Sequence, residues 1–267
     1  MRRATLREIA RGGRRLGAAA GRTIQSAALG VSRLLLTPRC AFCAEDFLPG
    51  APDQRLCLRC RAELLQPPLS RCLRCAAPLP LLSTASADGC AQCNDRLWRL
   101  DLAWTLGDYR NLLRAAILQT KNPHGSRLAR ELGRLLGQAC GEQLAKEKFE
   151  AVVPIPLHWT RRLKRGFSGP ELIAGELSRA LKVPLEARLL RRRRTVEIKF
   201  MSRSRRAQSL QGVFSVSSAY ELKNARILLV DDILTTGGTC NEAARALHWA
   251  GADYVGVAVV ARAARPR

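Results

Sequence analysis

Apolar and polar residues follow helical or strand-like spacing along the chain from residue 98 onward. In four segments, apolar side chains recur every three or four residues, which is the spacing of one helix face. These predicted helices are Asn111–Leu118, Leu128–Leu144, Glu171–Leu181 and Glu242–Ala250. Short runs of β-branched and aliphatic residues predict buried strands instead. These predicted strands are Ala151–Val153, Arg226–Val230 and Tyr254–Val260.

The last three elements follow one another as strand, helix and strand, which is the order of a parallel βαβ unit. The fold class predicted for this part of the chain is therefore α/β, with a parallel sheet that carries helices on both faces. The whole chain has 267 residues, enough for one or two domains.

The segment between the predicted strand that ends at Val230 and the next helix carries the most informative pattern. Two adjacent carboxylates, Asp231 and Asp232, follow the strand directly. A loop of small residues comes next and consists of Thr235, Thr236, Gly237, Gly238 and Thr239. Glycines allow tight turns that bring backbone N–H groups close to an anion, and the positive end of the helix dipole lies at the same point. The loop therefore predicts a phosphate site.

The two carboxylates predict a different role, because like charges repel and an aspartate is a poor ligand for phosphate. They can accept hydrogen bonds from paired sugar hydroxyls, or hold Mg²⁺ through water. Ligands of open parallel sheets bind at the carboxyl ends of the strands. Asp231 and Asp232 are therefore the predicted ribose-binding and catalytic residues. The alternative is a chance acidic turn before a threonine helix cap, but strand, acid pair, Gly-Thr loop and helix all agree with a ligand site.

Eight of the ten cysteines form four Cys-x-x-Cys pairs. The pairs are Cys40/Cys43, Cys57/Cys60, Cys72/Cys75 and Cys90/Cys93. Two such turns complete a tetrahedral Cys₄ zinc site with no open position for catalysis. The pattern predicts two structural Zn²⁺ ions and a reducing compartment, and so a cytoplasmic location. A redox dithiol or an iron–sulfur cluster is the alternative. The spacing does not by itself decide which pairs share an ion; the simplest expectation groups the first pair with the second and the third with the fourth.

Charge is distributed unevenly along the chain. Residues 1–39 are rich in arginine, and Glu8 is their only acid. They fit an organelle transit peptide, an amphipathic helix in contact with a membrane surface, or a basic tail. No apolar run reaches the roughly 18 residues that a membrane-spanning helix needs. The formal net charge of +23 favours polyanionic partners such as nucleic acid, anionic lipid or phosphorylated small molecules.

The segment Ile227–Thr239 resembles the phosphoribosyl pyrophosphate motif of type I phosphoribosyltransferases. Further segments occur in the order seen in ComF proteins, the competence-associated phosphoribosyltransferase-like proteins of bacteria. They are Leu35–Cys40, the paired cysteines, Val153–Leu157 and Arg161–Phe167. The resemblance implies a type I phosphoribosyltransferase-like sheet, preceded by a small Cys-rich double zinc ribbon. It also implies a link to natural transformation, in which incoming single-stranded DNA is handled.

With this resemblance, the chain divides into a basic N-terminal extension (1–39), a zinc ribbon module (40–97) and a phosphoribosyltransferase-like domain (98–267). In phosphoribosyltransferases, the loop after a strand comparable to Ala151–Val153 holds pyrophosphate. The cations of this expected loop are Arg161, Arg162, Lys164 and Arg165. An ordinary basic surface loop is the alternative. Lys121 also matches a family position that could reach the site, but we leave it out of the predicted site because Asn122 replaces the family phenylalanine.

The chain departs from the family pattern at polar positions. Gly166-Phe-Ser-Gly-Pro170 stands where the family continues Gly-Phe-Asn-Gln, and Ile198 and Ser209 replace a usual Gln and Asn. The missing groups could orient a substrate. Their loss therefore weakens the case for transfer chemistry more than the case for phosphate binding.

Three functional hypotheses follow. The first is a phosphoribosyltransferase that uses Mg²⁺ and an unidentified acceptor. The second is a non-catalytic module that binds single-stranded DNA or a nucleotide phosphate and contacts the DNA-uptake motor. In that case the basic stretches Arg191–Arg194 and Lys199–Arg206 would track a nucleic-acid backbone. The third is a regulator that senses phosphoribosyl pyrophosphate.

Overall fold

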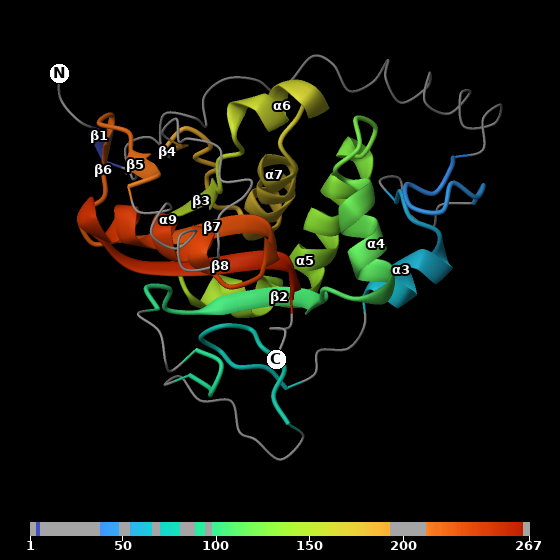
Figure 1. Ribbon diagram of the computed structural model, residues 1–267, viewed down its shortest axis with the longest axis horizontal. Coiled ribbons are helices and arrows are strands. Elements are labelled where there is room, and N and C mark those ends of the chain that lie inside the picture. The colour runs from blue at the N-terminus through green and yellow to red at the C-terminus, as the bar shows by residue number, and fades with distance from the viewer. Residues whose placement is uncertain are drawn as a thin grey trace, which may run out of the picture.

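The centre of the molecule is a four-stranded parallel sheet in the order β2-β8-β7-β3 (Figure 1). The computed structural model describes residues 4–5, 38–47, 54–65, 70–80, 89–93, 98–192 and 212–263. The four strands are β2 (Ala103–Asp108), β3 (Ala151–Pro154), β7 (Ala225–Leu234) and β8 (Ala252–Arg262). Because all four run parallel, their carboxyl ends lie at one edge of the sheet.

Helices cover both faces of this sheet, as predicted. They are α4 (Asn111–Gln119), α5 (Ser126–Lys146), α7 (Gly169–Leu181) and α9 (Gly238–Trp249). Side chains of a strand alternate between the two faces. Ile227 and Leu229 accordingly pack in the core beneath α9, whereas Leu228 and Val230 pack in the core beneath α4, α5 and α7. Both faces of β7 are therefore buried, which explains its continuous apolar run.

Helices α5 and α7 pack closely against each other. A Cβ atom at Gly133 would lie 2.8 Å from the backbone oxygen of Ile173, so only glycine fits there without a shift. The buried carboxylate of Glu176 lies beside this contact and pairs with Arg130 and Arg134 of α5. A third pair joins Glu176 to Arg179, one turn along α7. The interface therefore combines backbone proximity with one carboxylate that serves three guanidinium groups.

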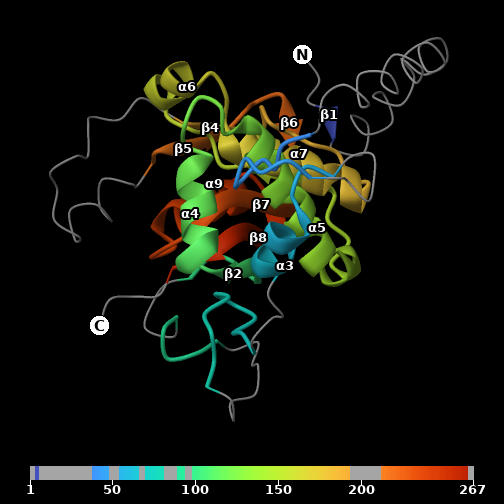
Figure 2. The ribbon, with the colours of Figure 1, turned by 90° about the vertical axis from the view of Figure 1, so that its right-hand side faces the viewer.

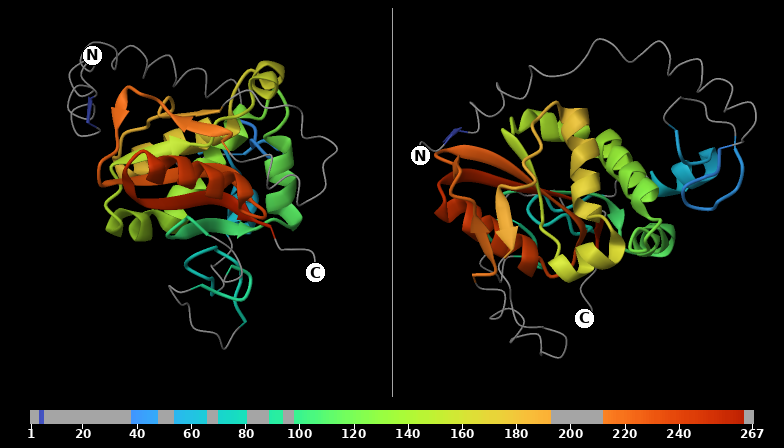
Figure 3. Two further views of the ribbon diagram at one scale, coloured as in Figure 1. Left: turned by 60° about the vertical axis from the view of Figure 1, so that its left-hand side comes forward. Right: turned by 90° about the horizontal axis from the view of Figure 1, so that it is seen from above.

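The smaller elements surround this core (Figure 2). They are β1 (Ala4–Thr5), α3 (Leu58–Leu64), α6 (Trp159–Arg165), β4 (Leu190–Arg192), β5 (Phe214–Val216) and β6 (Tyr220–Glu221). Strand β4 pairs antiparallel with β5, and β1 pairs parallel with β6. Helix α3 packs near α4, while residues 70–80 lie beside β2 at a separate place (Figure 3). The division of the chain at residues 39/40 and 97/98 stays a prediction.

The predicted helices and strands are confirmed in type, but several of their boundaries differ. Helix α9 begins at Gly238 rather than Glu242, so Gly238 and Thr239 of the predicted loop belong to its first turn. Strand β7 does not end at Val230; it continues to Leu234, so the acid pair belongs to the strand. The basic segment after β3 is not a loop but the short helix α6. Gly166 ends this helix with a φ of 74°, and its N–H donates to the carbonyl of Arg162. A glycine in the left-handed conformation ends a helix while its N–H still bonds one of the last carbonyls.

Several predicted features lie outside the described residues. They are most of the N-terminal extension, Arg193 and Arg194, Lys199–Arg206, Ile198 and Ser209. Among the helices that the structure does describe, none combines the length and the apolar character needed to cross a membrane.

Candidate functional site at the end of β7

The acid pair projects from the carboxyl end of β7 toward opposite faces of the sheet. Because side chains alternate along a strand, Asp231 lies on the α9 side and Asp232 on the α4 side. The contacts agree with this: Asp231 Oδ2 lies 4.0 Å from Cys240 Sγ in α9. Asp232 Oδ2 lies 3.8 Å from the ammonium of Lys121, just after α4. A ligand at this edge would therefore meet one carboxylate from each face.

The two carboxylates differ in their electrostatic surroundings. Oδ1 of Asp231 accepts a hydrogen bond of 2.8 Å from the backbone N–H of Asp232. Burial raises the pKa of Asp231 well above its usual range, the charge of Asp232 raises it further, and Lys121 offsets part of this effect. Burial and the same two acids raise the pKa of the Cys240 thiol, which is therefore neutral at physiological pH. The fold thus holds an acid in an environment that disfavours its charge, as functional sites often do.

Replacing Asp231 with asparagine is expected to stabilise the folded protein at pH 7. A carboxyl whose folded pKa is raised costs stability above its unfolded pKa of about 4, and this cost grows as pH rises toward the folded pKa. The amide oxygen of Asn can still accept the bond from residue 232. We expect a gain of about 1 kcal/mol, or about 2–4 °C in Tm, by calorimetry at constant zinc concentration. Asp232→Asn, which loses the pair with Lys121, should give no such gain; a lower Tm for Asp231→Asn would contradict this account.

The predicted phosphate loop follows the acid pair and starts helix α9. Gly237 has a φ of 79°, in the left-handed region that favours glycine, and it is the N-cap residue of α9. Its carbonyl accepts a bond of 2.7 Å from the N–H of Asn241, which begins the helix. Thr235 and Thr236 are exposed, whereas Gly237 is buried. The loop thus presents two hydroxyl side chains and a helix N-terminus at the sheet edge.

Two residues that were not predicted from the sequence, Arg262 and Trp98, contact the backbone of this loop on its buried side. The buried guanidinium of Arg262 donates to the carbonyls of Leu234 and Thr235 at the start of the loop. The ring of Trp98 packs on Gly237 so closely that a Cβ atom there would lie 2.3 Å from it. A lone arginine at the end of the apolar run of β8 was a signal for the first residue. No comparable signal marked Trp98, because its contact depends on the tertiary fold.

The predicted pyrophosphate cations lie on α6, at the same edge as the acid pair. Pro154, the last residue of β3, pairs with Val230 of β7, so the chain that enters α6 leaves the sheet next to Asp231. Arg162 is exposed and forms an ion pair of 3.3 Å with Glu171. Trp159 and Leu163 of the same helix are also exposed. The role of Arg161, Arg162, Lys164 and Arg165 in pyrophosphate binding stays a prediction.

The eight paired cysteines form two groups of four, and the structure settles which pairs belong together. The first group is Cys40, Cys43, Cys57 and Cys60, and the second is Cys72, Cys75, Cys90 and Cys93. No disulfide joins any of them, and within each group the sulfur atoms lie within 4.8 Å of one another. Individual S···S distances of 3.7–4.0 Å match the roughly 3.8 Å expected around a tetrahedral Zn²⁺ with Zn–S bonds of about 2.3 Å. Both groups therefore fit a structural metal ion.

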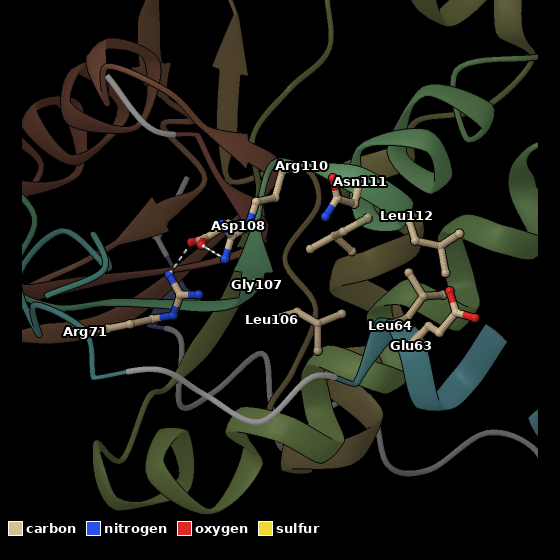
Figure 4. A pocket seen from close by; sticks show the side chains of 10 residues that line it. Glu63, Leu64, Arg71, Leu106, Gly107, Asp108, Arg110, Asn111 and Leu112 are labelled. Carbon is tan, nitrogen blue, oxygen red and sulfur yellow. Dashed lines mark hydrogen bonds and ion pairs between the residues drawn. The ribbon is translucent and has the colours of Figure 1, made fainter. Parts of the chain in front are cut away.

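A hollow lies at the carboxyl end of β2, between α3 and α4 (Figure 4). Asp108 of its wall pairs with Arg71 at 2.8 Å and with Arg110 at 3.1 Å. None of the predicted site residues lines it. The hollow is separated from the phosphate loop by strand β8, so the two are different places on the same edge.

Comparison with known proteins decides the family. Over 213 residues the chain is 30% identical to "Competence protein F" of Haemophilus influenzae, a match that covers 78% of this chain and 90% of that protein. The chain belongs to the ComF family. The phosphoribosyl transferase domain family matches residues 168–267 of this ComF protein, a region that contains β7, the acid pair and α9. The protein is therefore phosphoribosyltransferase-like.

Shorter or more distant similarities complete the comparison of this ComF protein. It is 40% identical over 56 residues to orotate phosphoribosyltransferase of Sulfurimonas denitrificans, a match that covers 21% of this chain and 28% of that protein. Among solved structures, a purine phosphoribosyltransferase from Pyrococcus horikoshii matches with a TM-score of 0.34 and 20% identity, over 48% of this chain and 71% of that chain. A glutamine phosphoribosylpyrophosphate amidotransferase from B. subtilis matches with a TM-score of 0.33 and 22% identity, over 49% and 25% of the two chains.

Proposed function

We propose that this ComF protein binds phosphoribosyl pyrophosphate together with Mg²⁺ at the carboxyl end of β7, and that this binding serves natural competence. The proposal rests on three features that follow one another along the chain: the acid pair at the end of β7, the Thr-Gly loop and the N-terminus of α9. Lys121, which lies 3.8 Å from Asp232, adds a cation from the opposite helix layer. The name of the Haemophilus influenzae relative supports the competence context.

Each group in the site would have a distinct task. The amides and hydroxyls of Thr235 to Thr239 would bind the 5′-phosphate, as helix N-termini bind anions. Asp231 and Asp232 would accept hydrogen bonds from the two ribose hydroxyls and hold Mg²⁺ through water. The cations of α6 would neutralise the pyrophosphate. If transfer occurs, the same groups would stabilise positive charge on the ribose ring and negative charge on the leaving pyrophosphate.

The test is calorimetry with phosphoribosyl pyrophosphate and Mg²⁺ on the full chain. We expect binding by the wild type and at least a tenfold loss of affinity in Asp231→Asn/Asp232→Asn, because neutral amides hold hydrated Mg²⁺ much more weakly than carboxylates do. A matched control is Asp253→Asn, an exposed acid at the opposite end of β8. Wild-type protein that gives no heat, with its zinc content and fold intact, would overturn the proposal.

A buffer comparison sharpens this experiment. Because the pKa of Asp231 is raised in the free protein, ligand binding that requires its charged form should release protons. The apparent enthalpy should then differ between buffers of low and high ionisation enthalpy, and affinity should rise as pH rises through this pKa. Asp231→Asn should remove the dependence on buffer.

One observation favours a second candidate, a module that binds single-stranded DNA. Trp159 is 52% exposed on α6, beside the exposed cations Arg162 and Lys164. Aromatic rings stack on bases while cations follow the phosphates. A steep fall of oligonucleotide affinity with salt, without heat from phosphoribosyl pyrophosphate, would favour this candidate. Pyrophosphate release with a panel of bases and amines separates a transferase from a protein that only binds the ligand.

A further inference from the structure

The second cysteine group is joined to the phosphate loop through one buried side chain, Arg262. Its Nε donates a bond of 2.8 Å to the carbonyl of Cys75, one of the four sulfur ligands. Its Nη1 donates to the carbonyls of Leu234, at 2.9 Å, and of Thr235. The residue is only 3% exposed. One guanidinium therefore bridges the backbone of a metal ligand and the backbone of the loop.

Trp98 makes a second connection between the same two places. Its indole Nε1 donates a bond of 2.9 Å to the carbonyl of Arg74, which lies between the ligands Cys72 and Cys75. Arg74 in turn donates to the carbonyl of Trp98. The ring then packs on Gly237, and the N–H of Arg99 donates to the side chain of Asn241 in the first turn of α9. The Cys72–Cys75 turn thus supports the loop from two directions.

The first cysteine group has no such contact with the loop among the described residues. It packs with α4 and α5, where Arg61 bonds Gln138 and the carbonyl of Phe42 accepts from Gln119. Gln119 lies two residues before Lys121, so this group reaches only the far side of the site. The two cysteine groups have the same chemistry, but they contact different parts of the protein.

We infer that the metal ion of the second cysteine group sets the geometry of the phosphate loop, with Arg262 and Trp98 as positioning residues. Four sulfur–metal bonds fix the turn that carries the Cys75 and Arg74 carbonyls, and these carbonyls fix the two side chains beneath the loop. Without the ion, the four thiols have no common partner and the turn can open. This inference rests on the proposed function for its consequence in ligand binding, but not for the coupling itself.

The experiment measures hydrogen exchange of the loop in the full-length protein without ligand. Cys90→Ser removes one ligand of the second group and leaves the Cys72–Cys75 turn unchanged in sequence. Cys43→Ser is the matched control in the first group, since both cysteines are partly exposed. We expect each variant to lose one zinc ion. Amides of residues 236–241 should exchange at least tenfold faster in Cys90→Ser and within about twofold of wild type in Cys43→Ser.

Variants of Arg262 and Trp98 test whether these two side chains connect the cysteine group to the loop. Arg262→Met should keep both zinc ions yet show the fast loop exchange of Cys90→Ser, and Arg262→Lys should restore part of the protection. The double variant Arg262→Met/Cys90→Ser should exchange no faster than the faster single variant, because both changes break one connection. If Arg262→Met does not fold, Trp98→Phe gives the same test, with severalfold faster exchange and both ions present.

The outcomes separate the two proposals. Loss of one zinc ion in Cys90→Ser with unchanged exchange at 236–241 would overturn the coupling, and so would equal effects of Cys43→Ser and Cys90→Ser. Calorimetry with phosphoribosyl pyrophosphate is then run on the same samples. Fast loop exchange in Cys90→Ser, with no binding heat even in the wild type, would uphold the coupling and reject the proposed ligand. Where the wild type binds, Cys90→Ser should bind at least tenfold more weakly and Cys43→Ser almost normally.

Discussion

Gly237→Ala is expected to destabilise the protein by roughly 2–5 kcal/mol. Left-handed backbone costs an alanine about 1–2 kcal/mol, and crowding in a packed core costs typically 1–3 kcal/mol more. At this position φ is 79°, and a Cβ atom would lie 2.3 Å from the Trp98 ring. The ring cannot move away cheaply, because it is buried and its indole N–H is bonded to Arg74. Denaturant unfolding followed by circular dichroism, at fixed zinc concentration, measures the loss.

Two further variants isolate the cause of this loss. Gly141→Ala, in the interior of α5 with open space around it, should gain up to about 1 kcal/mol because alanine favours the helix more than glycine. Trp98→Leu should remove most of the crowding, so that Gly237→Ala costs only the backbone part in that background. If Gly237→Ala unfolds at the same denaturant concentration as the wild type, the close packing of the Trp98 ring on Gly237 is wrong.

Glu176→Ala is expected to cost about 3 kcal/mol of folding free energy. Removing one partner of a buried ionic cluster leaves the others without their counter-charge, which typically costs 3–5 kcal/mol. The Glu176 side chain is 6% exposed and pairs with Arg179 at 2.7 Å, Arg134 at 3.2 Å and Arg130 at 3.5 Å. The lower end of the range applies because these arginines are 33–63% exposed and water can partly solvate them. Equilibrium urea unfolding at pH 7 measures the difference.

The pH dependence of this effect has a definite sign. Burial acts to raise the pKa of Glu176, but the bonds and charges of Arg179 and Arg134 outweigh it, so the pKa is lowered. A carboxylate with a lowered folded pKa stabilises the fold above its unfolded pKa of about 4.3, and this stabilisation is lost as pH falls through the folded pKa. The gap between wild type and Glu176→Gln should therefore shrink as pH falls below about 4.

Glu131 provides the matched control, because it is also buried and also bonds Arg134. Its pKa is raised, since burial outweighs the opposing effects of Arg134 and Arg55. Its charge therefore costs stability at neutral pH, and Glu131→Gln should be neutral or slightly stabilising at pH 7. Equal losses from Glu131→Gln and Glu176→Gln would contradict this account of the α5–α7 interface.

The helices and strands of the α/β domain could be predicted from the sequence because each has a regular pattern of apolar residues. Helices α4, α5, α7 and α9 bury one face, and strands β7 and β8 bury both. One error arose where charge was taken as the end of a strand. Asp231 and Asp232 continue β7 because backbone pairing with β8 extends to Leu234, whatever the side chains are. The other error is the basic segment, which was expected to be a loop because Pro154 and Pro156 precede it; it forms helix α6, which ends at the left-handed Gly166.

The sequence by itself determined the α/β class, the acid pair with its Thr-Gly loop, and the presence of two Cys₄ sets, because these depend on residue type and spacing over short distances. Only the tertiary structure decided the rest. It grouped the cysteines as 40/43/57/60 and 72/75/90/93, placed Asp231 and Asp232 on opposite faces of the sheet, and brought Lys121 beside Asp232. It also joined Cys75 to Arg262, 187 residues away, and Trp98 to Gly237. Such contacts depend on how distant segments pack together, and the spacing of residues within one helix or strand does not determine this packing.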